Sequence, residues 1–206
     1  MKQPLRSLIC LIICMKARLA VLATLCVVVV LNACGDPTNL RASSINTVDT
    51  LHVFALSGTP PTYPSGVSIV GRSAVRVDGF AGFDVAFDID ASGKAVVYPV
   101  KLVVTNPGGS RPVGLQKVAG SFETVLAAPS TGYENDSSLV LAPGETVVIQ
   151  SAHNGTNDIC QYALSPYLFA KIAVDSVNLA SRTIYLQLGL DPNCGFRSFA
   201  SGIPTS

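Results

Sequence analysis

The chain has 206 residues, almost half of them apolar and only 13% charged, where a globular average is about 25% charged. That length accommodates about one domain. The first thirty-three residues contain four basic residues and no acid, and the rest of the chain carries ten basic and thirteen acidic residues. This mildly acidic remainder has no basic stripe, which excludes a nucleic-acid binder, because neutralising phosphates requires clustered Lys and Arg.

The N-terminal segment has the layout of a secretory signal peptide. Residues 19–31 form a thirteen-residue apolar run interrupted only by Thr24, preceded by Lys16 and Arg18. Such a run is too short to cross a bilayer as a helix, and its basic flank is typical of a signal peptide. We therefore expect residues 1–33 to be removed. Because Met15 begins a compact signal peptide by itself, we also expect translation to start there.

The apolar run ends in Leu31-Asn32-Ala33-Cys34. This sequence resembles the lipobox of bacterial lipoproteins, in which an aliphatic residue, a variable small residue and Gly, Ala or Ser precede an invariant Cys. The resemblance implies that the Cys34 thiolate is alkylated by diacylglycerol and that cleavage occurs beside the small Ala33. Asn32 departs from the residues usual at its position. Gly35 is not the Asp that signals inner-membrane retention, so the resemblance favours the outer membrane.

Two acyl chains on the cysteine, usually with a third such as palmitate on the new amine, anchor a protein stably, whereas one chain is marginal. The alternative is an ordinary secretory peptide that leaves Cys34 as a free thiol. Residues 34–49 are polar and rich in small side chains, and we interpret them as the lipidated Cys and its flexible tether. Residues 50–206 then form the folded domain.

The sequence pattern of residues 50–206 predicts an all-β domain, because short apolar runs alternate with turn-forming clusters of Gly, Pro, Asn and Ser. The clearest strand is 83–90, whose odd positions are apolar and face a core, while Asp84 is expected on the solvent face with Asp88 and Asp90. A turn at 91–93 returns the chain into a second predicted strand. The other predicted strands are 50–56, 67–70, 74–77, 95–104, 114–118, 122–126, 145–151, 169–177 and 182–190.

Nine to eleven strands without a convincing helix predict an antiparallel β-sandwich. Its general architecture is expected to be immunoglobulin-like or fibronectin-like, with strands beyond the usual seven.

The cysteines of the mature chain can be paired by elimination. Cys34 is assigned to the lipid, which leaves Cys160 and Cys194 in a compartment that permits disulfides. Both lie just beyond the open end of the hairpin predicted from strands 169–177 and 182–190. The chain has no CxxC motif and no histidines at metal-ligand spacing, so we predict a disulfide rather than a metal or redox site.

A weak calcium motif lies in the turn after strand 83–90. Asp88, Asp90 and Ser92 occupy the first, third and fifth places of a calcium loop, followed by a Gly at the sixth. Pro99 stands where the loop requires a bidentate Glu, and Lys94 brings a positive charge beside the would-be ion. A β-hairpin with an acidic solvent face explains the same residues without a metal, so we predict no metal or other cofactor here.

A second candidate site is the polar loop that precedes Cys160. Ser151, His153 and Asp158 offer a nucleophile, a base and an acid within eight residues. Catalytic triads are assembled from separate elements, and the chain has no GxSxG elbow to expose a serine. The hydrolase hypothesis requires these side chains to converge with a second acid or base in one cleft.

Our first hypothesis is a non-enzymatic envelope lipoprotein, without a cofactor, whose β-sandwich binds an envelope protein or glycan or gives structural support. The alternatives are an extracytoplasmic hydrolase that uses His153 and Asp158, and a calcium-stabilised adhesion-type domain that uses Asp88 and Asp90. Fold alone cannot choose among these classes, because sandwich domains host many functions.

Overall fold

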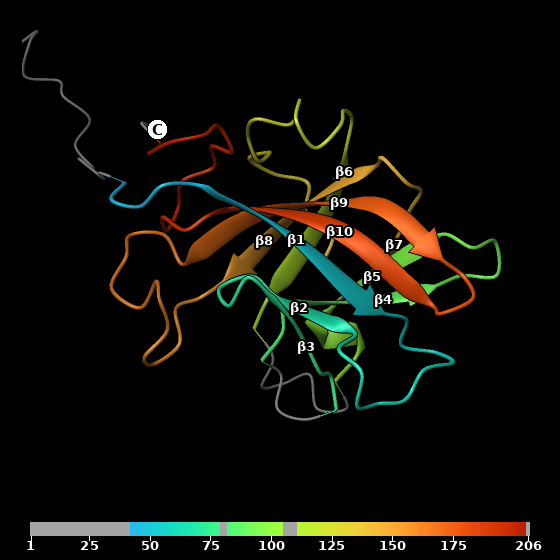
Figure 1. Cartoon of the computed structure of the whole chain (residues 1–206). Helices are drawn as coiled ribbons and strands as arrows, with labels where there is room; N and C mark the ends of the chain where they lie inside the picture. The colour runs from blue at the N-terminus through green and yellow to red at the C-terminus, as the bar shows by residue number, and fades with distance from the viewer. Residues whose placement is uncertain (1–41, 79–81, 105–110, 205–206) are drawn as a thin grey trace, which may run out of the picture. The chain divides into compact units, whose positions relative to one another are not determined.

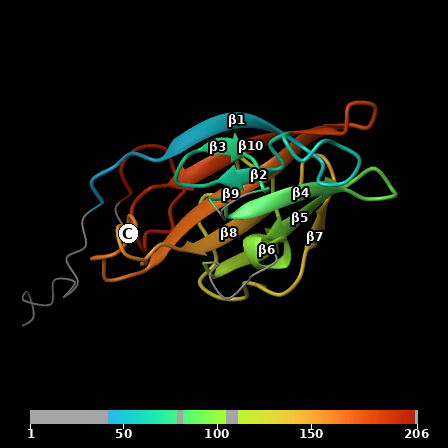
Figure 2. The same cartoon turned by 90° about the horizontal axis from the view of Figure 1, so that it is seen from below.

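The computed structural model describes residues 42–78, 82–104 and 111–204, and these form a β-sandwich of two five-stranded antiparallel sheets (Figures 1 and 2). In spatial order, sheet A consists of β1 (Thr47–Phe54), β10 (Thr183–Asp191), β9 (Tyr167–Asn178), β8 (Thr146–Ala152) and β6 (Val113–Val118). Sheet B consists of β3 (Ser73–Val75), β2 (Gly66–Ser68), β4 (Val85–Ile89), β5 (Ala95–Pro99) and β7 (Leu139–Leu141). The predicted all-β antiparallel sandwich is confirmed.

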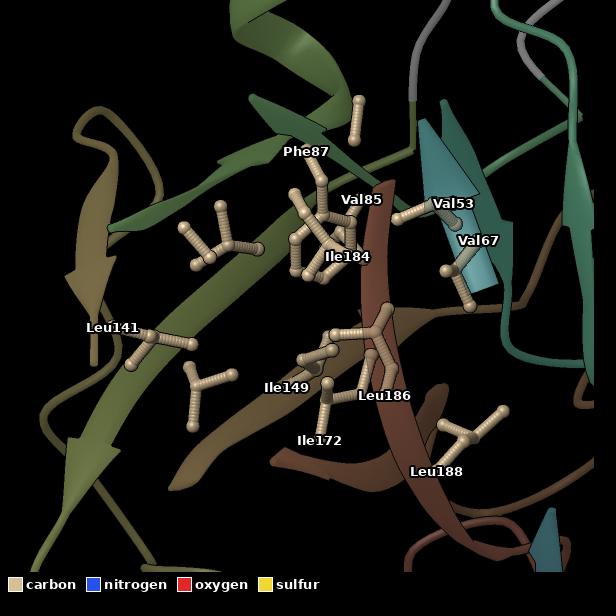
Figure 3. Packing of buried hydrophobic residues seen from close by; sticks show 14 of the residues in the cluster. Val53, Val67, Val85, Phe87, Leu141, Ile149, Ile172, Ile184, Leu186 and Leu188 are labelled. Carbon is tan, nitrogen blue, oxygen red and sulfur yellow. The ribbon is translucent and has the colours of Figure 1, made fainter. Parts of the chain in front are cut away.

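The main core lies between the two sheets. In β10, Ile184, Leu186 and Leu188 alternate with more polar residues, and each of the three is fully buried. A period of two places every second side chain on the same face of a strand, which is why this sequence forms a sheet with one apolar face. Figure 3 shows these side chains meeting Val85 and Phe87 of sheet B in the space between the sheets.

A smaller cluster covers the outer face of sheet A. Phe169 of β9 and Val148 of β8 pack there with Val125 and Ala128 of the segment after β6 and with Phe199 of the C-terminal segment. The buried Lys171 also belongs to this face: its ammonium donates to the carbonyls of Phe122 and Val125 and lies 4.2 Å from the centroid of the Phe122 ring. Because of this second layer, β9 is buried on both faces along most of its length.

Most predicted strands are confirmed within a few residues, but three predictions are wrong in detail. β1 begins at Thr47, so residues 47–49 belong to the sheet and not to the predicted tether. The strand predicted at 95–104 ends at Pro99, and the short 3-10 helix η1 (Val100–Leu102) follows it. Residues 122–126 contain no strand; they include a turn from which Phe122 and Val125 pack on sheet A, while Leu126 is exposed.

Loops at the two ends of the sandwich carry the chain between sheets and strands. The first residues of β1 and β9 lie at the same end of sheet A as the last residues of β8 and β10. The residue pairing between these antiparallel strands fixes this arrangement. The long loop 153–166 joins β8 to β9 at this end. No helix in the described ranges is long and apolar enough to cross a membrane.

Candidate functional site

Five polar side chains gather beneath the loop 153–166 (we call them the buried polar cluster). Asp84 immediately precedes β4, Arg111 precedes β6, Ser151 lies near the end of β8, His153 follows β8, and Asp158 lies in the loop itself. Because β4 belongs to sheet B while β6 and β8 belong to sheet A, the cluster joins the two sheets at one end of the sandwich.

Asp84 is at the centre of the cluster and is almost fully buried, with 1% of its surface exposed. Its Oδ1 accepts a 2.6 Å hydrogen bond from the Ser151 hydroxyl, and its Oδ2 accepts a 2.8 Å hydrogen bond from the backbone N–H of Ile69. His153 Nε2 lies 3.3 Å and Arg111 Nη1 lies 3.7 Å from Oδ1. The carboxylate thus has a partner on both oxygens, as a buried charge requires.

The prediction that Asp84 lies on the solvent face with Asp88 and Asp90 is therefore wrong. The alternation that places Asp88 near the surface holds within β4, but Asp84 precedes the first residue of that strand. The backbone of Asp84 stays bonded to sheet B, because its N–H donates to Val67 O, while its side chain reaches Ser151 of sheet A.

The ring of His153 is held between two carboxylates. His153 is fully buried, with Nδ1 3.0 Å from Asp158 Oδ1 on one side and Nε2 facing Asp84 on the other. Arg111 Nη1 contacts the ring and lies 3.0 Å from Nε2. The backbone of His153 is fixed as well, since its N–H donates to Pro166 O and its carbonyl accepts from the N–H of Cys160.

The electrostatics of the cluster favour an ionised Asp84. Burial by itself raises the pKa of this carboxyl, but the His153, Ser151 and Ile69 donors, together with the positive charge of Arg111, outweigh burial and lower the pKa below its ordinary value. A carboxylate with this many donors stays charged at neutral pH, so the cluster is built around a fixed negative charge.

The arrangement is not that of an activated serine. Ser151, His153 and Asp158 do converge, and Asp84 supplies the second acid that the hydrolase hypothesis requires. However, the Ser151 hydroxyl donates to Asp84, and among the described residues no hydrogen bond joins it to His153. Ser151 and His153 are fully buried, and only Arg111 and Asp158 reach the surface, with 29% and 23% of their side chains exposed. The geometry is that of a structural charge network.

The residues of the calcium motif lie in the β4–β5 hairpin. Asp88 Oδ1 accepts from the hydroxyl of Ser57 at 2.8 Å and from Arg182 Nη2 at 3.2 Å. Asp90 Oδ1 accepts from Ser92 Oγ at 2.7 Å and from the backbone N–H of Lys94 at 2.9 Å, which closes the turn. In each carboxylate these donors engage Oδ1. Over the part of the chain that the structure describes, no three His, Cys, Asp or Glu side chains are placed to hold a metal.

The predicted disulfide is confirmed: Cys160 and Cys194 are bonded, with a Cα–Cα distance of 5.7 Å. It ties the loop 153–166 to the segment that follows β10. The predicted lipidation residue, Cys34, lies outside the described residues, as do the signal peptide and residues 35–41 of the tether.

Sequence reasoning missed two members of the cluster, Asp84 and Arg111. Ser151, His153 and Asp158 are close in sequence and could be grouped by inspection, whereas Asp84 and Arg111 are brought to them by the pairing of β6 with β8 and by the stacking of the sheets. No local pattern around either residue indicates that contact.

Comparison with protein-family models, curated proteins and solved structures finds no match to this chain.

Proposed function

We propose that this chain is a bacterial envelope lipoprotein, anchored by Cys34, whose β-sandwich binds an envelope partner or supports the envelope without catalysing a reaction. The observation that carries the proposal is the sequence Leu31–Cys34 directly after the thirteen-residue apolar run. That order places a thiol where the lipid-transferring enzyme of the lipoprotein pathway would find it. Gly35 favours delivery to the outer membrane.

Two features of the folded domain support this proposal. The disulfide between Cys160 and Cys194 suits a domain that folds outside the reducing cytoplasm. In the buried polar cluster, Ser151 and His153 are shielded from solvent and hydrogen-bonded within the protein, which favours a structural role over a catalytic one.

The test is the chemical state and location of Cys34. Mass spectrometry of the membrane fraction should find an N-terminal peptide that begins at an acylated Cys34, and C34S should release the protein from the membrane. C26S is the matched control, because Cys26 lies in the segment that is removed and its loss should leave anchoring unchanged. An unmodified N-terminal peptide that starts elsewhere, or firm membrane binding by C34S, contradicts the proposal.

A further inference from the structure

Four segments meet at the end of the sandwich where β1 begins, which is the end nearest to Cys34 along the chain. We call these segments the tether end. They are residues 42–48, 159–165, 192–196 and 198–204. Their contacts are direct. The side chain of Asn193 accepts from the backbone N–H groups of Ser43 and Ser44, and the disulfide joins the second segment to the third. The backbone N–H of Asn46 donates to Gly202 O at 2.9 Å. The views in Figures 1 and 2 agree that these segments share one end of the domain.

The tether end exposes apolar side chains to an unusual degree. Tyr162 and Leu164 are 92% and 72% exposed, the two highest values among the large hydrophobic residues that the structure describes. Ile45, Ile159 and Ile203 are each more than half exposed at the same end. Single exposed apolar residues are ordinary on a protein surface, but a group of them at one end indicates an interaction surface.

The same four segments contain no Asp, Glu, Lys or Arg. Charged residues adjoin them: Asp49 follows the first segment, Asp158 precedes the second and is paired with His153, and the buried Asp191 precedes the third. The exposed Arg197 separates the last two segments. An uncharged, apolar surface can enter the interface of a bilayer without the cost of desolvating a charge. A cation at its border is attracted to anionic headgroups.

The length of chain before the domain keeps this end close to the membrane. Seven residues separate Cys34 from Ala42, the first described residue, and the eight residue-to-residue steps between the two span at most about 26–29 Å even when fully extended. The tether end is the part of the domain to which this short connection leads, so a lipid surface is always within its reach.

We propose that the tether end docks on the lipid surface, with Tyr162 and Leu164 inserted at the level of the headgroups. The inference rests on the proposed lipid anchor at Cys34. Tyrosine suits this position because its ring is apolar and its hydroxyl can stay in the polar layer. The disulfide and the hydrogen bond from Cys160 N to His153 O hold the loop in place, so docking orders little additional chain.

The chain has no tryptophan, so one introduced tryptophan reports on its own surroundings. The variant L164W carries this tryptophan on the tether end, and the variant L179W carries it at a control position. Leu179 is 60% exposed but follows Asn178, the last residue of β9, at the opposite end of that twelve-residue strand. Each lipidated full-length variant is reconstituted in vesicles of phosphatidylethanolamine and phosphatidylglycerol, with and without brominated lipid. Thermal unfolding checks that each variant keeps its fold, and Y162W repeats the measurement if L164W is destabilised.

We expect the emission of L164W to shift to the blue in vesicles and to be quenched by brominated lipid, while L179W emits as in water. If the protein co-sediments with vesicles and both tryptophans stay in water, the docking inference fails and the anchor stands. If L164W becomes shielded only in native membranes that contain other proteins, a protein partner covers this surface and the lipid inference also fails. If Cys34 carries no lipid, both proposals fail together.

Discussion

At the scale of single residues, Asp191 is a buried carboxyl with one unpaired oxygen. It ends β10, is fully buried, and uses Oδ1 to accept two hydrogen bonds from Asn193, whereas its buried Oδ2 has no partner. Burial raises the pKa of this carboxyl above its ordinary value, although the donors of Asn193 oppose the shift. Folding therefore favours the protonated form. As the pH rises from about 3.9 through the folded-state pKa, the protein must ionise a buried group and loses stability.

D191N should therefore stabilise the protein by about 1–3 kcal/mol at neutral pH, because it removes a buried charge and keeps an oxygen for Asn193. The gain should shrink toward pH 4, where wild-type Asp191 is already protonated. Urea unfolding at both pH values measures it. D175N is the matched control, since Asp175 lies on the neighbouring strand but is exposed and should show no such gain. A D191N variant less stable than wild type at pH 7 would refute the argument.

At the scale of elements, the alternation of apolar and polar residues predicts where strands lie, but it does not predict which segments and side chains pack against them. The period of two in 83–90 identifies β4, and the turn signal after it identifies the hairpin with β5. The same kind of reasoning fails for 122–126, because apolar residues that pack beneath a turn on the outer face of sheet A look locally like a strand. It fails for Asp84 because burial there is decided by contact with Ser151, sixty-seven residues away.

The disulfide was predicted correctly from the sequence, because the two strands predicted for one hairpin place both cysteines beyond its open end. The bond closes a loop with a sequence separation of 34 residues, which on the chain-entropy model contributes about 3–4 kcal/mol. C160A/C194A should lose about that much stability while keeping its fold, because the pairing of β8 with β9 does not depend on the bond.

Urea unfolding followed by circular dichroism measures this loss. Wild-type protein with reductant should match the double variant, and the double variant should not respond to reductant. An unfolding midpoint equal to that of oxidised wild type would mean that the backbone bonds from His153 to Cys160 and Pro166 alone hold the loop.

At the scale of the whole molecule, the two sheets share an apolar core and a buried polar junction at Asp84. Composition and strand count predict a sandwich, but the order of strands in each sheet depends on pairings between distant segments, such as β1 with β10. The junction at Asp84 depends on that order, since it needs β8 of sheet A beside the start of β4 of sheet B. This is why the chemistry of the buried polar cluster was not predictable even though three of its members had been singled out.

Because Asp84 joins the sheets, its ionisation should be coupled to global stability. Its folded-state pKa is lowered, so the ionised form contributes stability that is fully present above the ordinary Asp pKa of about 3.9 and is lost as the pH falls through the folded value. D84N removes this charge and replaces one acceptor oxygen with a donor, which must then face either the Ser151 hydroxyl or the Ile69 N–H. Breaking a buried ionic network by removing one partner costs about 3–5 kcal/mol, and we expect a loss of that size at pH 7.

The pH profile separates this mechanism from a general packing defect. Urea unfolding between pH 7 and pH 3 should show that wild type loses stability below about pH 4, while D84N changes less because its amide does not titrate. D90N is the control on the same hairpin, since Asp90 is only partly buried and closes the β4–β5 turn, and its loss at pH 7 should be much smaller. If D84N and wild type lose stability in parallel as the pH falls, the carboxylate between the sheets is not what makes the folded domain sensitive to acid.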